Sequence, residues 1–278
     1  MSDPVVRRVK AGDGTGLNVR VRGEGHPVVF LHELLCGSCG FEPVIDLLER
    51  DWQCVSFDAR GFPPSDVPDL PGAYSQDAAG SDLFDVMDHC GLDTAHVVGV
   101  SMGASAALHA ALTVPRRVRT LTLVSIGTGS TSTPEQQAKS MEALAASFES
   151  KSPEELLPGF LTRPNRRTLA DIPSARAIFE ACFLALSPAG LAGTVRGALR
   201  NRPSLFTMSD ELRDLQMPVL VICGSEDEPC LEPSRFLART VPGAELDIFP
   251  GMGHGLYLES PEMLARACER IFQRSTVS

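Results

Sequence analysis

The sequence predicts an α/β fold with a mostly parallel central sheet flanked by helices. Short apolar runs rich in Val, Ile and Phe alternate with longer segments of helical periodicity, which is the element order of such folds. The apolar runs contain almost no charged residues, as expected of strands that are buried on both faces. One unusually long gap between two of these runs predicts an inserted helical segment.

The chain opens with residues 4–10 and 17–22, which are joined by the turn-forming stretch AGDGTG and predict an antiparallel hairpin. Six further strands are expected at PVVFL (27–31), QCVSF (53–57), HVVGV (96–100), LTLVSI (121–126), PVLVIC (218–223) and ELDIF (245–249). Helical periodicity predicts helices at about 41–50, 77–90, 102–113, 231–240 and 260–273.

The gap between Ile126 and Pro218 exceeds ninety residues, whereas a crossover between parallel strands takes about a dozen or somewhat more. Helical periodicity continues inside it, in PEQQAKSMEALAASFES, PEELLPGFL and ARAIFEACFLALSPAGLAGTV. We therefore expect residues 130–215 to form a helical cap over the strand ends, and residues 1–129 and 216–278 to form the core domain. A separately folded helical domain is the weaker alternative, because the segment is short and the sheet pattern resumes directly after it.

The composition limits the possible partners. Hydrophobic residues make up 43% of the chain and charged residues 22%, which is typical of a globular protein. The net charge of −10 repels nucleic acids and anionic membranes, and no cluster of Lys and Arg offsets it. The N-terminal stretch lacks the apolar region of a secretory signal, and no apolar run approaches the ~18 residues of a membrane span. We expect a soluble, cytoplasmic protein without nucleic-acid or membrane partners.

Eight cysteines are scattered over a chain that is too long to depend on disulfides. We interpret most of them as small buried hydrophobic residues in a reducing compartment. Cys36 and Cys39 form one C-x-x-C, but no second pair follows, and the pair does not open a helix of a thioredoxin-like unit. With no other ligand cluster and no phosphate-binding loop, the sequence predicts neither a metal nor an organic cofactor.

The segment HVVGVSMGA contains the pattern G-x-S-x-G around Ser101. The pattern lies between a predicted buried strand and an Ala-rich helix, which is the context that it requires. A strained turn between strand and helix exposes the serine hydroxyl, and the positive end of the helix favours a developing oxyanion. We therefore predict that Ser101 is a nucleophile.

A serine hydroxyl reacts only when a neighbouring base takes its proton. His254 lies in a Gly-rich loop after the last predicted strand, where the imidazole can return over Ser101. His32 ends a strand but precedes the nucleophile, and the other histidines lie before strands or on helices: His26, His89, His96 and His109. His254 is the predicted base.

The third member of the catalytic triad, beside the nucleophile and the base, is expected to be a carboxylate. It should follow a strand that lies between the other two in the chain. Glu226, Asp227 and Glu228 come directly after the strand that ends at Cys223, and the G-x-x-D spacing from Gly224 selects Asp227. Asp227 would hold the tautomer of the histidine and stabilise the imidazolium. A solvated acidic turn is the alternative.

With these motifs, nearly the whole chain resembles the capped form of the α/β-hydrolase superfamily, which includes enol-lactone hydrolases, C–C bond hydrolases, esterases and epoxide hydrolases. The segment FLHELLCGS resembles the family's oxyanion loop, and FDARGFPPSD resembles its D-x-R-G-x-G-x-S-D segment. The resemblance implies an oxyanion hole formed by the backbone N–H groups of Leu34 and Met102. Two residues depart from the family pattern, because Glu33 and Pro63 each replace a glycine.

Glu33 and Val100 are the candidate substrate-contacting residues. If Glu33 points into the pocket, it disfavours anionic substrates or acts as an extra acid; alternatively it faces solvent or pairs with an arginine. Six arginines of the predicted cap are candidates for meeting a substrate carboxylate, although solvated helix faces are the simpler explanation: Arg163, Arg166, Arg167, Arg176, Arg196 and Arg200.

The sequence thus predicts an enzyme that cleaves an ester, lactone or related carbonyl bond of a small molecule through an acyl-enzyme. A serine at position 101 argues against dehalogenase and epoxide hydrolase chemistry, which the family performs with an aspartate. C–C bond cleavage, a lyase step or a cyclisation on the same three residues is the second hypothesis, since a fold does not fix a reaction. A small-molecule receptor is the third. The oligomeric state cannot be inferred from the sequence.

Overall fold

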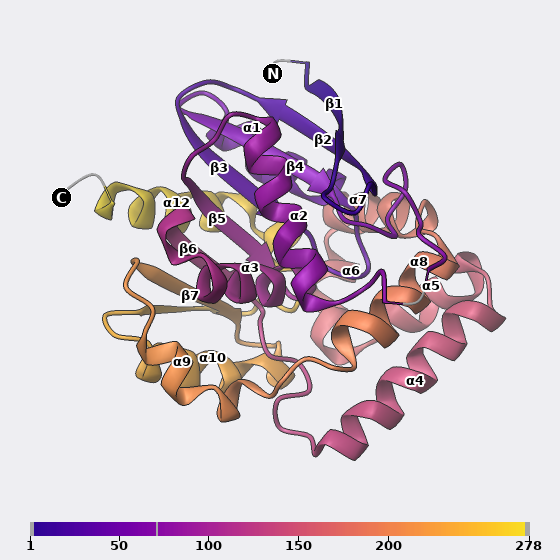
Figure 1. Cartoon of the computed structure of the whole chain (residues 1–278). Helices are drawn as coiled ribbons and strands as arrows, with labels where there is room; N and C mark the ends of the chain where they lie inside the picture. Colours follow the sequence, from indigo (N-terminus) through magenta and orange to yellow (C-terminus); the bar gives the residue numbers. More distant parts are fainter. Residues whose placement is uncertain (1–2, 71, 276–278) are drawn as a thin grey trace.

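An eight-stranded sheet runs through the middle of the protein, which a computed structural model describes for residues 3–70 and 72–275 (Figure 1). The strand order is β1-β2-β4-β3-β5-β6-β7-β8. β2 pairs antiparallel with β1 and with β4, and all other pairings are parallel. The strands are β1 Val5–Lys10, β2 Gly16–Arg22, β3 His26–Leu31, β4 Trp52–Asp58, β5 Ala95–Val100, β6 Val118–Val124, β7 Val219–Gly224 and β8 Glu245–Phe249.

Helices cover both faces of the sheet. α2 (Gln76–His89) and α3 (Met102–Thr113) lie in front of it in Figure 1, and α12 (Pro261–Arg274) lies behind. α10 (Glu228–Thr240) joins the face of α2 and α3, and α1 (Glu42–Leu48) packs beside α12. In α12 the buried residues Leu264, Cys268 and Ile271 recur at helical spacing, so one stripe of the helix faces the sheet.

The chain between β6 and β7 is largely helical and gathers at one side of the sheet (Figure 1). Capping boxes start α4 and α5, in which Thr133 pairs with Gln136 and Ser152 with Glu155. Apolar residues from α4 to α8 belong to the same hydrophobic cluster as α1 and α12. The helices and single turns are α4 Pro134–Ser150, α5 Pro153–Leu161, η3 Pro164–Arg166, α6 Arg167–Asp171, α7 Pro173–Leu184, α8 Pro188–Thr194, η4 Val195–Leu199, η5 Leu205–Thr207 and α9 Ser209–Arg213.

The predicted fold class is confirmed: a mostly parallel sheet, an antiparallel opening hairpin, helices on both faces and a helical insertion. β6 ends two residues earlier than expected, since Ser125 turns the chain with a φ of 51°. The division into a core and a cap at residues 130 and 215 stays a prediction. Near the end of the expected cap, Leu205 and Leu212 pack in the hydrophobic cluster that includes residues of α2, α3 and α10.

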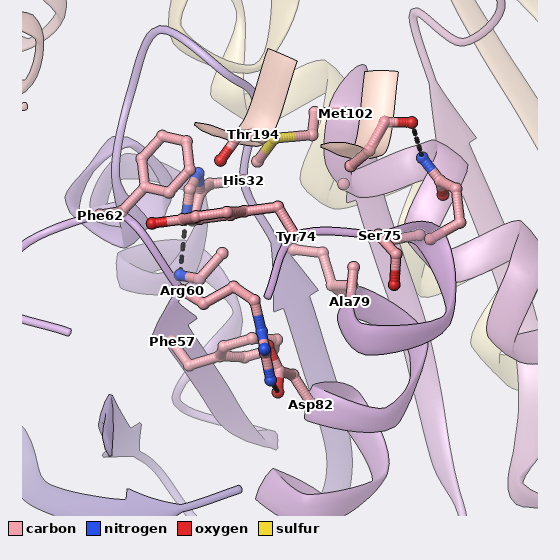
Figure 2. Close-up of a pocket in the computed structure, with 16 residues that line it drawn as sticks. His32, Phe57, Arg60, Phe62, Tyr74, Ser75, Ala79, Asp82, Met102 and Thr194 are labelled. Atoms are coloured by element: carbon pink, nitrogen blue, oxygen red, sulfur yellow. Dashed lines mark hydrogen bonds and ion pairs between the residues drawn. The ribbon is translucent and has the colours of Figure 1, made fainter. Parts of the chain in front are cut away.

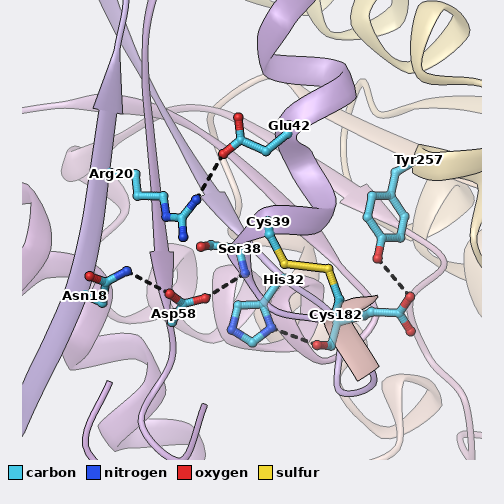
Figure 3. The surroundings of a disulfide bond; sticks show 10 residues. Asn18, Arg20, His32, Ser38, Cys39, Glu42, Asp58, Cys182 and Tyr257 are labelled. Carbon is cyan, nitrogen blue, oxygen red and sulfur yellow. Dashed lines mark hydrogen bonds and ion pairs between the residues drawn. A yellow bond between two sulfur atoms is a disulfide. The ribbon is translucent and has the colours of Figure 1, made fainter. Parts of the chain in front are cut away.

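The structure contains a disulfide that the sequence did not predict. Cys39, in the turn η1 (Ser38–Phe41), forms a disulfide with Cys182 of α7 (Figure 3). The two residues are 143 positions apart, so only the folding of the inserted segment onto η1 brings them together. Of the six other cysteines, Cys90 is half-buried and the rest are buried, as expected: Cys36, Cys54, Cys223, Cys230 and Cys268.

No single helix among the described residues is long and apolar enough to cross a membrane. One pair, Pro173–Leu184 and Pro188–Leu199, meets the length and composition criteria together but is bent by 93°.

The turn after β5 requires a glycine at position 103. A Cβ there would overlap the backbone of Leu31 and the carbonyl oxygen of His32. We expect Gly103→Ala to lower the free energy of unfolding by about 1–3 kcal/mol, measured by urea denaturation. Gly159→Ala is the matched control, because its Cβ meets no atom within 4 Å in α5, and it should be neutral or stabilising by up to about 1 kcal/mol. Equal stability of the two variants would contradict this.

Candidate active site

Ser101 lies in the tight turn between β5 and α3. Its φ of 53° and ψ of −106° put a non-glycine residue in a strained backbone region. Its N–H donates to the carbonyl oxygen of Val124 at the end of β6 (2.8 Å), and its own carbonyl accepts from the N–H of Ser105 in α3 (3.1 Å). Sheet and helix therefore hold this turn from both sides, and the side chain is left half-buried.

Three side chains form a hydrogen-bonded chain at the carboxyl edge of the sheet. His254, in the loop between β8 and α11 (Leu256–Glu259), has its Nε2 3.0 Å from the Oγ of Ser101. Its Nδ1 lies 2.8 Å from the Oδ2 of Asp227, which follows β7. With the proton on Nδ1, the ring donates to the carboxylate and accepts from the hydroxyl. The parallel strands β5, β7 and β8 end at the same edge, which is why residues so distant in sequence meet.

Asp227 is fully buried, and both of its oxygens have partners. Oδ2 accepts from His254, and Oδ1 accepts from the side-chain amide of Asn165 at 3.0 Å. The carbonyl oxygen of Asn165 in turn accepts from the backbone N–H of His254 at 2.7 Å. Asn165 belongs to the inserted segment, so this segment helps to fix the positions of both the acid and the imidazole.

The charges of the pair stabilise each other. Burial alone would raise the pKa of Asp227, but the adjacent imidazole outweighs it and lowers the pKa of this carboxyl to about 2. Burial also acts against a charged ring, yet the Asp227 carboxylate outweighs it and raises the pKa of His254 above its ordinary value of 6.5. Asp227 thus stays ionised, and it stabilises a proton on His254.

The residues of the predicted oxyanion hole lie beside Ser101. Leu34 and Met102 line a cavity of about 130 Å³ together with Ser101 and His254. The loop that carries Leu34 is fixed by His32, whose Nδ1 donates to the carbonyl oxygen of Glu33 (2.7 Å) and whose Nε2 accepts from the N–H of Ala59 (3.0 Å). Burial lowers the pKa of His32, so this ring is neutral and positions the loop.

Glu33 lines the same cavity, but its carboxylate is held by protein groups. It forms a buried ion pair with Arg166 of η3. It also accepts from the hydroxyl of Tyr257 at 3.0 Å; Tyr257 is labelled in Figure 3. Glu33 is 1% exposed and Arg166 3% exposed. Burial opposes the charge, but Arg166 and His254 outweigh it and lower the pKa of Glu33. Of the alternatives drawn from the sequence, pairing with an arginine describes the structure.

The family model of the alpha/beta hydrolase fold matches residues 26–261. The chain belongs to the α/β-hydrolase fold family. Two curated relatives match this α/β-hydrolase along most of their length. A putative 2-succinyl-6-hydroxy-2,4-cyclohexadiene-1-carboxylate synthase of Bacillus subtilis is 27% identical over 90% of this chain and 93% of its own. The 2-(acetamidomethylene)succinate hydrolase of Mesorhizobium japonicum is 28% identical over 95% and 93%.

Among solved structures, a thermophilic esterase from Thermogutta terrifontis superposes with a TM-score of 0.86. It is 24% identical, and the alignment covers 99% of each chain. At that identity the likeness shows the fold alone.

Val100, the last residue of β5, directly precedes Ser101 in this α/β-hydrolase. Its side chain is fully buried in the hydrophobic core and does not line the cavity that contains Ser101. Side chains alternate between the two faces of a strand, and residue 100 is the last one of β5. That Val100 contacts the substrate stays a prediction.

Two groups of possible metal ligands occur in the described part of the chain. Cys36, Cys39 and Cys182 form one, but two of these sulfurs are joined in the disulfide. Asp227, Cys230 and His254 form the other, and here the carboxylate and Nδ1 already bind each other. Burial raises the pKa of the Cys230 thiol to about 11, which disfavours the thiolate that a metal requires.

A second pocket is lined by Met102 together with His32, Tyr74 and Thr194 (Figure 2). It measures about 40 Å³ and its lining does not include Ser101. The hydroxyl of Tyr74 is buried there without a partner among the described residues, as is that of Thr194. The space holds about a water molecule or two, which would satisfy these hydroxyls.

Sequence reasoning missed Asn165, Tyr257 and Arg202. Tyr257 supports Glu33, and Arg202 lines the cavity. Asn165 stands in the stretch TRPNRRTLADIP, which has no periodicity, and no local motif marks any of the three.

The buried pair of Glu33 and Arg166 gives a stability test. Glu33→Gln leaves the guanidinium of Arg166 buried without its counter-ion, and we expect the free energy of unfolding to fall by about 3–5 kcal/mol. The double variant Glu33→Gln/Arg166→Met removes the buried charge and should regain most of that loss. Chemical denaturation measures both variants.

The control is the exposed pair of Arg239 and Glu232, whose side chains are 57% and 50% exposed. Glu232→Gln should change the free energy of unfolding by less than about 1 kcal/mol. If Glu33→Gln costs no more than Glu232→Gln, the buried pair does not have the stabilising role described here.

Proposed function

We propose that this α/β-hydrolase is a serine hydrolase that cleaves an ester, lactone or related carbonyl bond of a small molecule through an acyl-enzyme. One observation carries the proposal: the imidazole of His254 is hydrogen-bonded on one side to the hydroxyl of Ser101 and on the other to the carboxylate of Asp227. Ser101 and His254 also line a cavity. This order of nucleophile, base and acid is the arrangement that activates a serine.

In the proposed reaction, the Oγ of Ser101 attacks the substrate carbonyl while Nε2 of His254 takes the hydroxyl proton. The oxyanion of the tetrahedral intermediate accepts hydrogen bonds from the N–H groups of Leu34 and Met102. His254 then passes the proton to the leaving alkoxide, and the acyl group remains as an ester on Ser101. A water molecule, deprotonated by His254, attacks that ester and releases the acid and free Ser101.

The role of Asp227 in this scheme is electrostatic. Its carboxylate stays ionised, because its pKa is about 2, and it stabilises the imidazolium that forms twice in each cycle. Asn165 acts as a positioning residue that holds Asp227 and the backbone of His254. The reaction as written needs a small-molecule substrate and water, and no metal or organic cofactor takes part in it.

A non-hydrolytic reaction on the same three residues is the second candidate, because the relative from Bacillus subtilis carries the name of a synthase. Trapping of a covalent intermediate decides between the hydrolytic and the non-hydrolytic reaction. A stoichiometric acyl adduct on Ser101, seen by mass spectrometry of the intact protein during turnover, supports the acyl-enzyme. Turnover of a substrate without such an adduct supports the second candidate.

Removal of the nucleophile gives the first functional test. Ser101→Ala should lower kcat on an activated ester by about 10⁴-fold or more, with little change in the thermal unfolding midpoint. The same variant should lose covalent labelling by a fluorophosphonate probe. Ser105→Ala is a matched control one helical turn away, and it should keep its labelling. Unchanged turnover in Ser101→Ala would refute the proposed nucleophile.

The dependence of activity on pH tests His254. The base must be neutral to accept a proton, and Asp227 raises its pKa above 6.5. We therefore expect kcat/KM to fall with decreasing pH through an inflection above pH 6.5. Asp227→Asn removes the charge that raises this pKa, so the inflection should move to lower pH while the rate drops by about 10⁴-fold. An inflection at the same pH in both proteins would show that another group controls the profile.

A further inference from the structure

The cavity beside Ser101 has an excess of positive charge. Its lining includes three arginines, Arg163, Arg166 and Arg202, but only one carboxylate, that of Glu33. Glu33 neutralises Arg166. Among the residues that the structure describes, no carboxylate lies within ion-pair distance of Arg163 or Arg202. These two positive charges therefore face the cavity uncompensated, in a chain whose net charge is −10.

Arg202 is half-buried and held in place by neutral groups. Its guanidinium donates to the carbonyl oxygen of Thr128 and to the Oγ of Ser105 at 3.3 Å. Ser105 lies one helical turn after Ser101 in α3, and the backbone N–H of Ser105 donates to the carbonyl of Ser101. The guanidinium is thus fixed close to the nucleophile, and it keeps further N–H donors for a ligand.

Burial lowers the pKa of Arg202, and no carboxylate of residues 3–70 or 72–275 pairs with it. A guanidinium in such a place gains strongly from an anion, because a charge-assisted hydrogen bond offsets its loss of solvation. Planar guanidinium and carboxylate groups also match in geometry.

Arg163 occupies the rim of the same cavity. Its guanidinium carbon lies 4.3 Å from the centre of the Phe160 ring, and it is exposed. Stacking on an aromatic ring holds the side chain without neutralising its charge. Arg163 is thus available to attract an anion from solvent and to share it with the deeper site.

Arg176, Arg196 and Arg200 of the inserted segment differ from these two. Arg176 pairs with Glu180, Arg196 pairs with Glu142 and Glu149, and Arg200 lies near Glu142. These pairs are on the surface and away from the cavity. The absence of a carboxylate partner among the described residues therefore distinguishes the two cavity arginines from the paired ones.

We propose that Arg202, assisted by Arg163, binds a carboxylate that the substrate carries in addition to the bond that is cleaved. The substrate is then a small anionic ester or lactone whose carboxylate is recognised on the side of the cavity that Thr128 and Arg202 line. This inference rests on the proposed hydrolytic function, because it assigns a substrate class to the same site.

A pair of substrates that differ only in charge tests the inference. The mono-p-nitrophenyl ester of glutaric acid carries a free carboxylate, and p-nitrophenyl butyrate is a neutral ester of similar size. We expect the wild-type kcat/KM to favour the anionic ester, and this preference to weaken as salt is added. In Arg202→Gln the preference should fall by about 10- to 100-fold.

Two variants complete the comparison. Arg202→Lys keeps the charge but loses the planar pair of donors, so it should retain part of the preference. Arg167→Gln removes an exposed arginine of the same segment that does not line the cavity, and it should leave both activities as in the wild type. A preference that is equal in wild type and Arg202→Gln overturns the proposal, as does a wild type that does not favour the anionic ester.

A binding measurement separates this inference from the proposed function. If neither ester is hydrolysed, the hydrolytic proposal fails, and titration calorimetry with glutarate still decides whether the cavity takes a carboxylate. Wild type and Ser101→Ala should bind glutarate with similar affinity, and Arg202→Gln should bind at least about tenfold more weakly. Glutaramide, the neutral analogue, should not compete. No binding of glutarate to the wild type, or equal binding to Arg202→Gln, overturns the inference.

Discussion

A carboxylate can be buried only where its charge and both of its oxygens are compensated, and Asp227 meets this constraint with groups from separate parts of the chain. The imidazole comes from the loop after β8, and the amide comes from Asn165 of the inserted segment. The backbone of that segment also accepts from the N–H of His254. The fold and the candidate site are therefore not independent, because burial of the acid requires that the sheet edge, the last loop and the insertion meet.

The same coupling occurs on the other side of Ser101. The loop after β3 carries Glu33, whose charge is balanced by Arg166 from the insertion, and Tyr257 of α11 supplies a further hydrogen bond. The disulfide between Cys39 and Cys182 joins the turn after this loop to α7. Polar contacts of Asn165 and Arg166 and the disulfide of Cys182 thus join the insertion to the loops at the sheet edge.

Charge is distributed unevenly between the surface and the cavity. Arg176 and Arg196 of the insertion are paired with glutamates at the surface, and the buried Arg166 is paired with Glu33. Arg163 and Arg202 face the cavity without such partners among the described residues. A departure from the family pattern at position 33 therefore does not make the cavity negative, because the added carboxylate is neutralised within the protein.

The sequence by itself determined the order of strands and helices, because apolar runs and helical periodicity are local signals. It also identified Ser101, Asp227 and His254, each of which follows an apolar run whose end reaches the same sheet edge. Only the tertiary structure decided the partner of Glu33, which is 133 residues away, the disulfide between residues 143 apart, and the contact of Asn165 with Asp227 across 62 residues. These contacts depend on how the inserted helices pack over the sheet edge, and no local pattern of residues encodes that packing.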